Sequence, residues 1–363
     1  MHIYLGFDFY GAGNIGDDLM LAGFLDIYRE YHSIPLVCPI RWDHSPPLSK
    51  RFPEIQWIRS TPGARPRFIH ESLFWLGVGG TPFQVSDGPW FLERIRGDLE
   101  VIAQAEKPMY MLGVGAEAEC LERRDDVLRI LENIDHIWTR DRCTSDLLKD
   151  LYGLGSERVE EGSDLANISL SRIFADSGAH DADRVHNLAI GYSASSLCHA
   201  NALDIMRFTD YVRRDGDVVF FGNETRKHKN YEYGIYKSIY GGLRGVIKKP
   251  SVRLFLPDYK GSTLEGLVRH YATYRVVMSS RYHALLCAAW AGCRVAGLGD
   301  GSKLRSLSEQ LDIPVVTRPL TTERLMHGYE NAKSVARPIL EAMARKTRES
   351  VRELCSLASF PGY

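Results

Sequence analysis

Short apolar runs alternate with amphipathic stretches along most of the chain. The runs expected to form strands are HIYLGF, IPLVCPI, SLFWLGVGG, KPMYMLGVGA, DHIWTR and RVEEGSD in the first half, and NLAIGYSA, DVVFFG, VRLFLP, RVVMSS and RVAGLG in the second. Helices are expected to begin at about Ala202, Thr263, Tyr282 and Lys303. After Thr322 the chain turns helical to its end, with a kink or break at Pro338. This alternation is typical of βα units and parallel sheets.

The polar segment FADSGAHDADRVH, residues 174–186, contains few large apolar side chains and is interpreted as a linker. We therefore expect an N-terminal α/β domain at residues 1–178 and a C-terminal α/β domain at 187–322. Residues 323–363 would form a helical segment that packs back on the N-terminal domain. Two doubly wound domains facing one another across a cleft bind ligands at the carboxyl ends of their strands, so functional residues should directly follow strands.

Composition narrows the class of protein. The 363 residues suffice for two domains, and 45 Lys and Arg balance 46 Asp and Glu, so no global field would attract nucleic acid or an anionic membrane. The seven cysteines include no C-x-x-C pair, which indicates reduced thiols of a cytoplasmic protein. No apolar run reaches about 18 residues and the N-terminus lacks a basic segment followed by an apolar one, so neither a membrane span nor a signal peptide is expected.

The opening loop, residues 11–16, has the spacing G-x-G-x-x-G between the first strand and the first helix. A dinucleotide-binding loop would require an acidic residue at the end of the second strand, and IPLVCPI ends without one. Asn14, Asp17 and Asp18 also place polar and negative groups where a pyrophosphate would bind. A dinucleotide site is therefore disfavoured, which leaves a loop for another ligand or a glycine turn that only allows packing.

Two glycine motifs and one arginine follow strands in the first half. Gly79 in LGVGGTPF and Gly115 in LGVGAEAE would let a ligand or another backbone approach closely. Arg140, in IWTRDRC, leaves a strand directly before a helix. Close packing of neighbouring strand ends explains the glycines equally well, and a solvated surface arginine beside Asp141 is the alternative for Arg140.

The most informative stretch is YRVVMSSRYHALLCAAWAG, residues 274–292. Its β-rich run is followed by Ser279 and Ser280, which are good N-cap residues, and by an Ala/Leu-rich helix. Arg281 and His283 would then lie in the first helical turn, beside unsatisfied backbone N–H groups and the positive end of the helix dipole. A cation there is unfavourable for the helix itself, which indicates that an anionic ligand supplies the negative charge.

Lys303 repeats this arrangement in GLGDGSKLRSL, just after a glycine-rich strand end. The sequence has no His-x-x-x-His pair, and no Asp/Glu cluster with ligand spacing follows the expected strands. We therefore expect that the protein needs no metal.

Several of these motifs occur together in the polysaccharide pyruvyl transferase family, which the chain resembles from about residue 5 to residue 312. The motifs are YGAGNIGDD, the Gly-Val-Gly strand ends, TRD after the fifth expected strand, GSDLA after the sixth, SSRYHALLCAAWAG and the later GSK. The block Arg-x-His-Ala-x-x-x-Ala-x-x-x-Gly is the most specific part. Residues 195–260 match no pattern, so the resemblance identifies no acceptor-binding residues there.

The resemblance implies two Rossmann-like domains similar to the glycosyltransferase-B arrangement. It also implies transfer of an enolpyruvyl-derived group from phosphoenolpyruvate to two hydroxyls of a sugar, as a ketal, in cell-surface polysaccharide biosynthesis. Phosphoenolpyruvate would be the donor substrate and no separate cofactor is expected. The acceptor would be a sugar, for example in a lipid-linked oligosaccharide that brings the protein to the membrane surface, and no nucleic acid is involved.

The resemblance also suggests roles for individual residues. Arg140, Arg281 and Lys303 would converge from both domains on the phosphate and carboxylate of the donor. His283 would act as the general acid that protonates the methylene carbon, although a purely packing role is the alternative. The remaining substrate-binding residues would be Gly13, Asn14, Asp17, Gly79 and Gly115.

Two other function classes remain. A glycosyltransferase with a nucleotide-sugar donor would share the fold and would be expected to carry a Glu in the second domain that holds the ribose, and no convincing Glu occurs near residues 281–303. A non-catalytic carbohydrate-binding protein would need none of the three cations. Binding of labelled phosphoenolpyruvate, compared with a nucleotide sugar, discriminates among the three classes.

Overall fold

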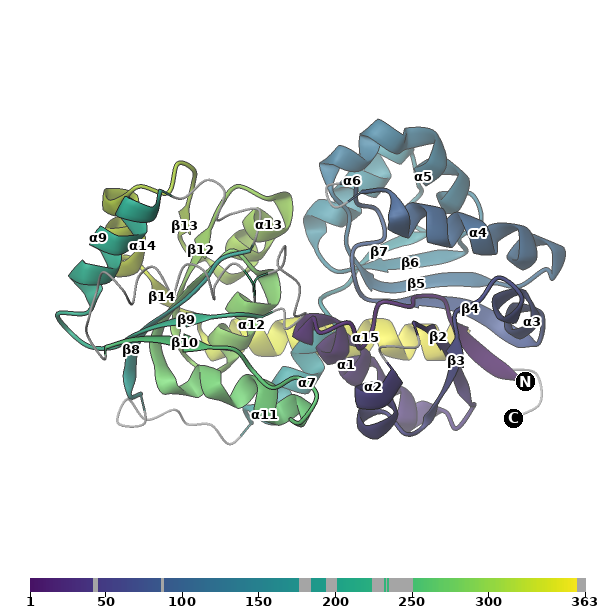
Figure 1. Cartoon of the computed structure of the whole chain (residues 1–363). Helices are drawn as coiled ribbons and strands as arrows, with labels where there is room; N and C mark the ends of the chain where they lie inside the picture. Colours follow the sequence, from purple (N-terminus) through teal and green to yellow (C-terminus); the bar gives the residue numbers. More distant parts are fainter. Residues whose placement is uncertain are drawn as a thin grey trace. The chain divides into compact units, whose positions relative to one another are not determined.

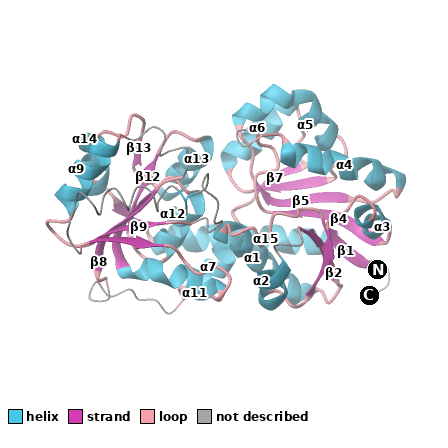
Figure 2. Ribbon diagram, in the orientation of Figure 1, coloured by secondary structure: helices cyan, strands magenta, loops and turns pink. Residues whose placement is uncertain are grey.

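The computed structural model describes residues 1–41, 45–85, 88–175, 184–193, 201–223, 232, 234 and 251–357. The chain forms two compact α/β units, which can be followed along the chain in Figure 1 and by element type in Figure 2. Unit 1 comprises Met1–Ala12, Asp17–Ser169 and Ala342–Tyr363. Unit 2 comprises Gly13–Gly16 and Leu170–Glu341.

Unit 1 is built on a seven-stranded parallel sheet in the order β3-β2-β1-β4-β5-β6-β7. The strands are β1 (His2–Leu5), β2 (Leu36–Ile40), β3 (Ile55–Arg59), β4 (Ser72–Val78), β5 (Met109–Val114), β6 (His136–Thr139) and β7 (Val159–Glu161). The strand order reverses between β1 and β4. The loops after these two strands, which contain the opening glycines and Gly79, therefore lie at the switch point where doubly wound sheets bind ligands.

Helices connect the strands of unit 1, because parallel neighbours require a crossover. They are α1 (Ile15–Tyr31), α2 (Ser45–Arg51), α3 (Ala64–His70), α4 (Trp90–Gln104), η2 (Ala118–Arg123), α5 (Arg124–Leu131) and α6 (Arg142–Tyr152), followed by α7 (Ala166–Ile173), which leads into unit 2. Local sequence sets the bounds of α6. Asp141 caps its start by accepting from the Thr144 N–H at 2.8 Å, and Gly153 ends it at φ +67°.

Unit 2 is also built on a parallel sheet, in the order β10-β9-β8-β11-β12-β13, with β14 antiparallel to β12. The strands are β8 (His186–Gly191), β9 (Val218–Phe221), β10 (Val252–Phe255), β11 (Tyr274–Ser279), β12 (Arg294–Leu298), β13 (Val315–Val316) and β14 (Lys333–Ser334). The strand order reverses between β8 and β11. The segment that follows β11 is the one predicted to carry Arg281 and His283, so it lies at the switch point of this sheet.

The helices of unit 2 begin close to the predicted residues. They are α9 (Ala202–Val212), α11 (Leu264–Val268), η4 (Arg269–Thr273), α12 (Tyr282–Trp290), α13 (Ser302–Leu311) and α14 (Thr322–Glu330). One apolar cluster of the unit packs α9 and α14 against strands β8 to β13 of the sheet. Predicted starts at 202, 263, 282 and 303 are therefore confirmed to within one residue.

The last helix, α15 (Arg337–Leu357), returns the chain to unit 1. Pro338 is its second residue, where a missing N–H costs no helical hydrogen bond. The predicted kink or break near this proline is a break between Glu330 and Arg337, just before the proline. In unit 1, Thr347 Oγ1 donates to the Asp164 carbonyl at 3.1 Å, and Trp138 Nε1 donates to Glu353 Oε2 at 2.9 Å.

The observed division of the chain differs from the predicted boundaries. Unit 1 gives way to unit 2 after Ser169 rather than at residue 178, and α14, in the predicted terminal segment 323–363, belongs to unit 2. Of the predicted linker, residues 176–183 lie outside the described residues. The sequence missed β3, in which only Ile55 and Ile58 are buried and no apolar run forms, and the two-residue strands β13 and β14. Among the described residues, no helix combines the length and apolar character needed to cross a membrane.

Candidate active site

Two helices of unit 2 begin at the carboxyl ends of neighbouring parallel strands. β11 leads into α12 and β12 leads into α13, and Ser279 of β11 pairs with Gly297 of β12. Arg281 immediately precedes α12, and Lys303 is the second residue of α13. The register of the sheet therefore places Arg281 and Lys303 on the same side of unit 2, at the carboxyl ends of its strands.

The turn between β11 and α12 is fastened to the end of β8. Ser279 Oγ donates to the Gly191 carbonyl at 2.9 Å, and Ser280 Oγ accepts from the Ser193 N–H at 2.6 Å. The Arg281 N–H donates to Ser279 Oγ at 3.1 Å. Arg281 is itself the N-cap residue, and its side chain makes no capping hydrogen bond. The prediction that the serines cap the helix is therefore wrong, because their hydroxyls hold the turn to the sheet.

Arg281 has an internal carboxylate partner that the sequence did not reveal. Its Nε donates to Oε1 of Glu232, whose side chain is 1% exposed. The Arg281 side chain is 34% exposed, so it extends from this buried carboxylate to solvent. The protein itself thus supplies a negative charge beside Arg281, where a ligand charge was expected. A guanidinium has five N–H donors, so this partner does not use all of them. Glu232 lies within residues 195–260, where no motif was recognised.

His283 differs in burial from the other residues of α12. Of the nine residues of this helix, all described, only His283 is not buried. Its imidazole lies against Gly16, since a Cβ built on Gly16 would overlap the Nδ1, Cγ and Cε1 atoms of the ring. The Gly16 N–H donates to Asn14 Oδ1 at 3.2 Å, and the His283 ring meets the Tyr282 ring edge-on, with 5.2 Å between centroids. The structure thus brings His283 together with loop residues Gly13–Gly16 in unit 2.

The two acidic residues that directly follow the opening loop differ in their surroundings. Asp18 is fully buried and accepts from the Gly11 N–H at 3.0 Å and from Arg51 Nη1 at 2.7 Å, so its charge holds the loop to α2. Asp17 is half-buried in the first turn of α1. Gly13 has φ +98°, a conformation that favours glycine. Between the two carboxylates, Asp17 is the one whose contact with a ligand stays a prediction.

Arg140 of unit 1 is buried. Its side chain is 3% exposed, and its Nε lies 3.3 Å from Asp141 Oδ2 and 4.0 Å from Asp164 Oδ2. A Cβ on Gly115 would overlap the Arg140 guanidinium, so the glycine makes room for it. A solvated surface arginine is therefore excluded. Asp164 belongs to the GSDLA motif, but its proximity to Arg140 could not be read from the motif itself.

Gly79 packs closely against α1. It has φ +67°, and a Cβ there would overlap Met20. The N–H of the next residue, Gly80, lies 3.3 Å from Met20 Sδ. The glycine thus packs against a helix, where the sequence suggested packing against a neighbouring strand end, and a contact of Gly79 with a ligand stays a prediction.

The predicted site residues are divided between the two units. Unit 1 holds Asp17, Gly79, Gly115 and Arg140. Unit 2 holds Gly13, Asn14, Arg281, His283 and Lys303. The convergence of Arg140 with the cations of unit 2 stays a prediction.

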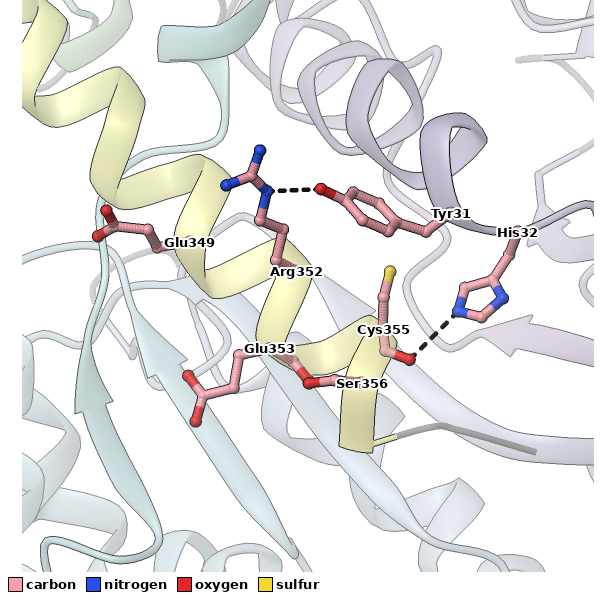
Figure 3. Close-up of a pocket in the computed structure, with 7 residues that line it drawn as sticks. All are labelled: Tyr31, His32, Glu349, Arg352, Glu353, Cys355 and Ser356. Atoms are coloured by element: carbon pink, nitrogen blue, oxygen red, sulfur yellow. Dashed lines mark hydrogen bonds between the residues drawn. The ribbon is translucent and has the colours of Figure 1, made fainter. Parts of the chain in front are cut away.

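A cavity of about 540 Å³ in unit 1 contains none of the predicted site residues. Figure 3 shows it between the end of α1 and α15, lined by Tyr31, His32, Glu349, Arg352, Glu353, Cys355 and Ser356. Arg352 Nε donates to Tyr31 Oη, and His32 Nε2 lies 3.2 Å from the Cys355 carbonyl. These contacts tie α15 to α1, which indicates a structural role for this face.

One group among the described residues has the spacing of metal ligands. It consists of His136, Glu160 and Glu353, whose candidate ligand atoms lie within 4.8 Å of one another, and it includes no predicted site residue. Burial, followed by the hydrogen bond and charge of Glu353, raises the pKa of Glu160 to about 7. Burial would also raise the pKa of Glu353, but hydrogen bonds from Glu160 and Trp138 outweigh it and lower the pKa. The expectation that the protein needs no metal stays a prediction.

This carboxyl pair predicts a pH-dependent stability. Because the pKa of Glu160 is raised in the folded state, its stabilising contribution is present below about pH 4.5 and is lost as the pH rises toward 7. Glu160→Gln keeps a hydrogen-bond donor for Glu353 without this titration. We expect the variant to melt higher than the wild type at pH 8 and to lose this advantage at pH 5, as measured by calorimetry. Glu161→Gln, which changes a carboxylate outside the pair, is the control. A difference in melting temperature between Glu160→Gln and the wild type that is equal at both pH values would contradict the prediction.

Comparisons with known proteins identify the family and the fold. Residues 14–302 match the family model of polysaccharide pyruvyl transferase, and no curated protein matches the chain. The structure is similar to that of UDP-GlcNAc 2-epimerase from Neisseria meningitidis bound to UDP-GlcNAc, with a TM-score of 0.63 and 10% identity over 98% of this chain and 99% of that one.

Two further solved structures are similar over nearly the whole chain. Anabaena Alr3699/HepE in complex with UDP and glucose has a TM-score of 0.63 and 10% identity, covering 99% of both chains. UDP-GlcNAc 2-epimerase from Methanocaldococcus jannaschii has a TM-score of 0.66 and 9% identity, covering 98% of this chain and 99% of that one. These likenesses confirm the predicted α/β fold similar to glycosyltransferase-B. Because the family model spans most of the sequence, the chain belongs to the polysaccharide pyruvyl transferase family.

Proposed function

We propose that this protein transfers the enolpyruvyl-derived group of phosphoenolpyruvate to two hydroxyls of a sugar. The observation that carries the proposal is the placement of Arg281, His283 and Lys303 at the starts of two helices on one edge of the unit 2 sheet. Phosphoenolpyruvate has a phosphate and a carboxylate, so it requires several cations. Helix N-termini add backbone N–H groups and a positive dipole that favour such anions.

The reaction balances without an oxidant or a reductant. A proton is added to the methylene carbon, a sugar hydroxyl attacks the adjacent carbon, and the C–O bond to phosphate breaks. A second sugar hydroxyl then attacks the same carbon and closes the ketal. Of the two hydroxyl protons released, one replaces the proton consumed by the methylene carbon and the other leaves with inorganic phosphate.

The residues of unit 2 have distinct roles in this proposal. Arg281 and Lys303 hold the donor anions, and His283 protonates the methylene carbon as a general acid. His283 suits this role because it is the half-buried polar residue of an otherwise buried helix, and its ring is held in place against Gly16. Asn14 fixes the loop that contacts the ring.

The donor is a substrate, so the proposal includes no separate cofactor. The acceptor would be a sugar of a cell-surface polysaccharide, for example on a lipid-linked oligosaccharide at the cytoplasmic face of the membrane. Mass spectrometry of surface glycans from cells that lack the protein would then show the loss of pyruvate ketals.

A direct test uses the purified protein with labelled phosphoenolpyruvate and candidate sugars. We expect release of inorganic phosphate that depends on the sugar, and, in heavy water, one deuterium in the methyl group of the product. Binding of a nucleotide sugar in place of phosphoenolpyruvate would reject the proposal.

A nucleotide-sugar glycosyltransferase is the second candidate, because two of the similar structures named above, from Neisseria meningitidis and Anabaena, were solved with UDP-GlcNAc or with UDP and glucose. Such an enzyme would be expected to hold the ribose with a Glu of the second domain. Glu232 does not fit that role, since its carboxylate is 1% exposed and already accepts from Arg281 and from the Asn223 N–H.

The contact between Gly16 and His283 gives a further prediction. Gly16→Ala should displace the imidazole, because the added methyl would overlap the ring, and turnover should fall about tenfold or more. The fold should persist, since alanine favours a helix over glycine by about 1 kcal/mol. The control is Gly97→Ala in α4, where a Cβ would meet no atom within 4 Å. Wild-type turnover in Gly16→Ala, measured with phosphate release, would show that the ring position is unimportant.

A further inference from the structure

The Glu232 carboxylate accepts hydrogen bonds from the protein itself. Its side chain is 1% exposed, and a buried carboxylate is costly unless donors compensate its charge. Oε2 accepts from the Asn223 N–H at 2.8 Å, and Oε1 accepts from Arg281 Nε. Both oxygens are therefore engaged by donors within unit 2.

Asn223, which donates to Glu232, is itself held by a hydrogen bond. Asn223 follows β9 by two residues, and its Oδ1 accepts from the fully buried Tyr271 hydroxyl at 3.1 Å. β9 pairs with β8, which pairs with β11, the strand that leads to Arg281. A chain of contacts from Tyr271 through Asn223 and Glu232 to Arg281 thus spans the carboxyl edge of three neighbouring strands.

We propose that Glu232 is the positioning residue that orients the Arg281 guanidinium toward the donor anion. This inference rests on the proposed function. An arginine side chain has many rotamers, and a hydrogen bond from its Nε to a buried carboxylate that also accepts from a backbone N–H fixes the plane of the guanidinium. The Arg281 side chain is 34% exposed, so part of it remains in contact with solvent. A pre-oriented fork binds an anion better because less freedom is lost on binding.

The direction in which Glu232→Gln changes the affinity for phosphoenolpyruvate distinguishes positioning of Arg281 from simple charge balance. If Glu232 only neutralised Arg281, Glu232→Gln would remove a negative charge near the donor site and phosphoenolpyruvate would bind more tightly. If Glu232 positions Arg281, Glu232→Gln should weaken binding, because an amide cannot accept equally well from both donors. Glu232→Asp keeps the charge but loses reach, so positioning predicts weaker binding for this variant too.

The experiment measures phosphoenolpyruvate binding by calorimetry. We expect Glu232→Gln and Glu232→Asp to raise Kd about tenfold or more. The control is Asp204→Ala, which removes the contacts of Asp204 Oδ1 with the backbone and hydroxyl of Thr322 between α9 and α14. It should lower the melting temperature without changing Kd. Equal or tighter binding by Glu232→Gln would overturn the proposal, whatever its melting temperature.

A spectroscopic measurement reports on the pair without any donor. The Arg281 Nε–H resonance, assigned by its absence in Arg281→Lys, should be protected from exchange in the wild type and in Asp204→Ala, and lose this protection in Glu232→Gln. Unchanged protection in Glu232→Gln would overturn the proposal. If Glu232→Gln does not fold, Tyr271→Phe removes only the hydroxyl behind Asn223. It should weaken donor binding, and an unchanged Kd would contradict a positioning role for the contacts that run from Tyr271 through Asn223 and Glu232 to Arg281.

Measuring whether the wild-type protein binds phosphoenolpyruvate distinguishes failure of this inference from failure of the proposed function. Its absence rejects the proposed function, and the same variants are then titrated with UDP-GlcNAc. Weaker binding by Glu232→Gln would still support positioning of Arg281, and unchanged binding would overturn it.

Discussion

Replacement of His283 by Gln is expected to lower turnover by about 10²–10⁴-fold while donor affinity and fold are largely retained. The loss follows from removal of the group that protonates the methylene carbon. The fold should persist because the other residues of α12 are buried and hold the helix against the sheet. Donor affinity should persist because Gln can still form hydrogen bonds at the start of the helix.

Turnover by phosphate release, Kd for phosphoenolpyruvate and melting temperature are measured on the same preparations. The control is His327→Gln, which changes an exposed histidine of α14 and should leave turnover within about twofold of the wild type. A packing role for His283 would instead lower the melting temperature more than the rate. Near-normal turnover in His283→Gln would remove this residue from the mechanism.

Much of the fold follows from local sequence, because each strand and helix carries its own apolar pattern. β11 and α12 show this, since Val276–Met278 forms a buried strand and the Ala/Leu-rich run after it forms a buried helix. β13 and β14 have two residues each, too few for any periodicity. The grouping of Gly13–Gly16 with unit 2 also depends on tertiary contacts that no local pattern encodes.

The site could be predicted only where its residues are adjacent in sequence. Arg281 and His283 were found because both follow a strand and begin a helix. Glu232 was missed because its contact with Arg281 joins residues 49 apart in sequence, and nothing around it forms a recognisable motif. Ser279 was assigned to the wrong partner, because the same hydroxyl can cap a helix or bind a neighbouring strand, and the Gly191 carbonyl decides between them.

Replacement of Arg281 by Ala should have two separate effects. Phosphoenolpyruvate binding should weaken about 10- to 100-fold, because a charge-assisted contact contributes about 1.5–3 kcal/mol. The free energy of unfolding should also fall by about 2 kcal/mol or more, because Glu232 would remain buried without its charged partner. Calorimetric titration measures the first effect, and denaturant unfolding measures the second.

Two further variants separate these effects. Arg281→Ala combined with Glu232→Gln should recover most of the lost stability, since no unpaired charge remains, yet bind the donor no better than Arg281→Ala. Arg281→Lys should recover donor binding only in part, because an ammonium replaces a planar fork that can hold a phosphate or carboxylate with two parallel hydrogen bonds. Unchanged affinity for phosphoenolpyruvate in both Arg281→Ala and Arg281→Lys would place the donor site elsewhere in the protein.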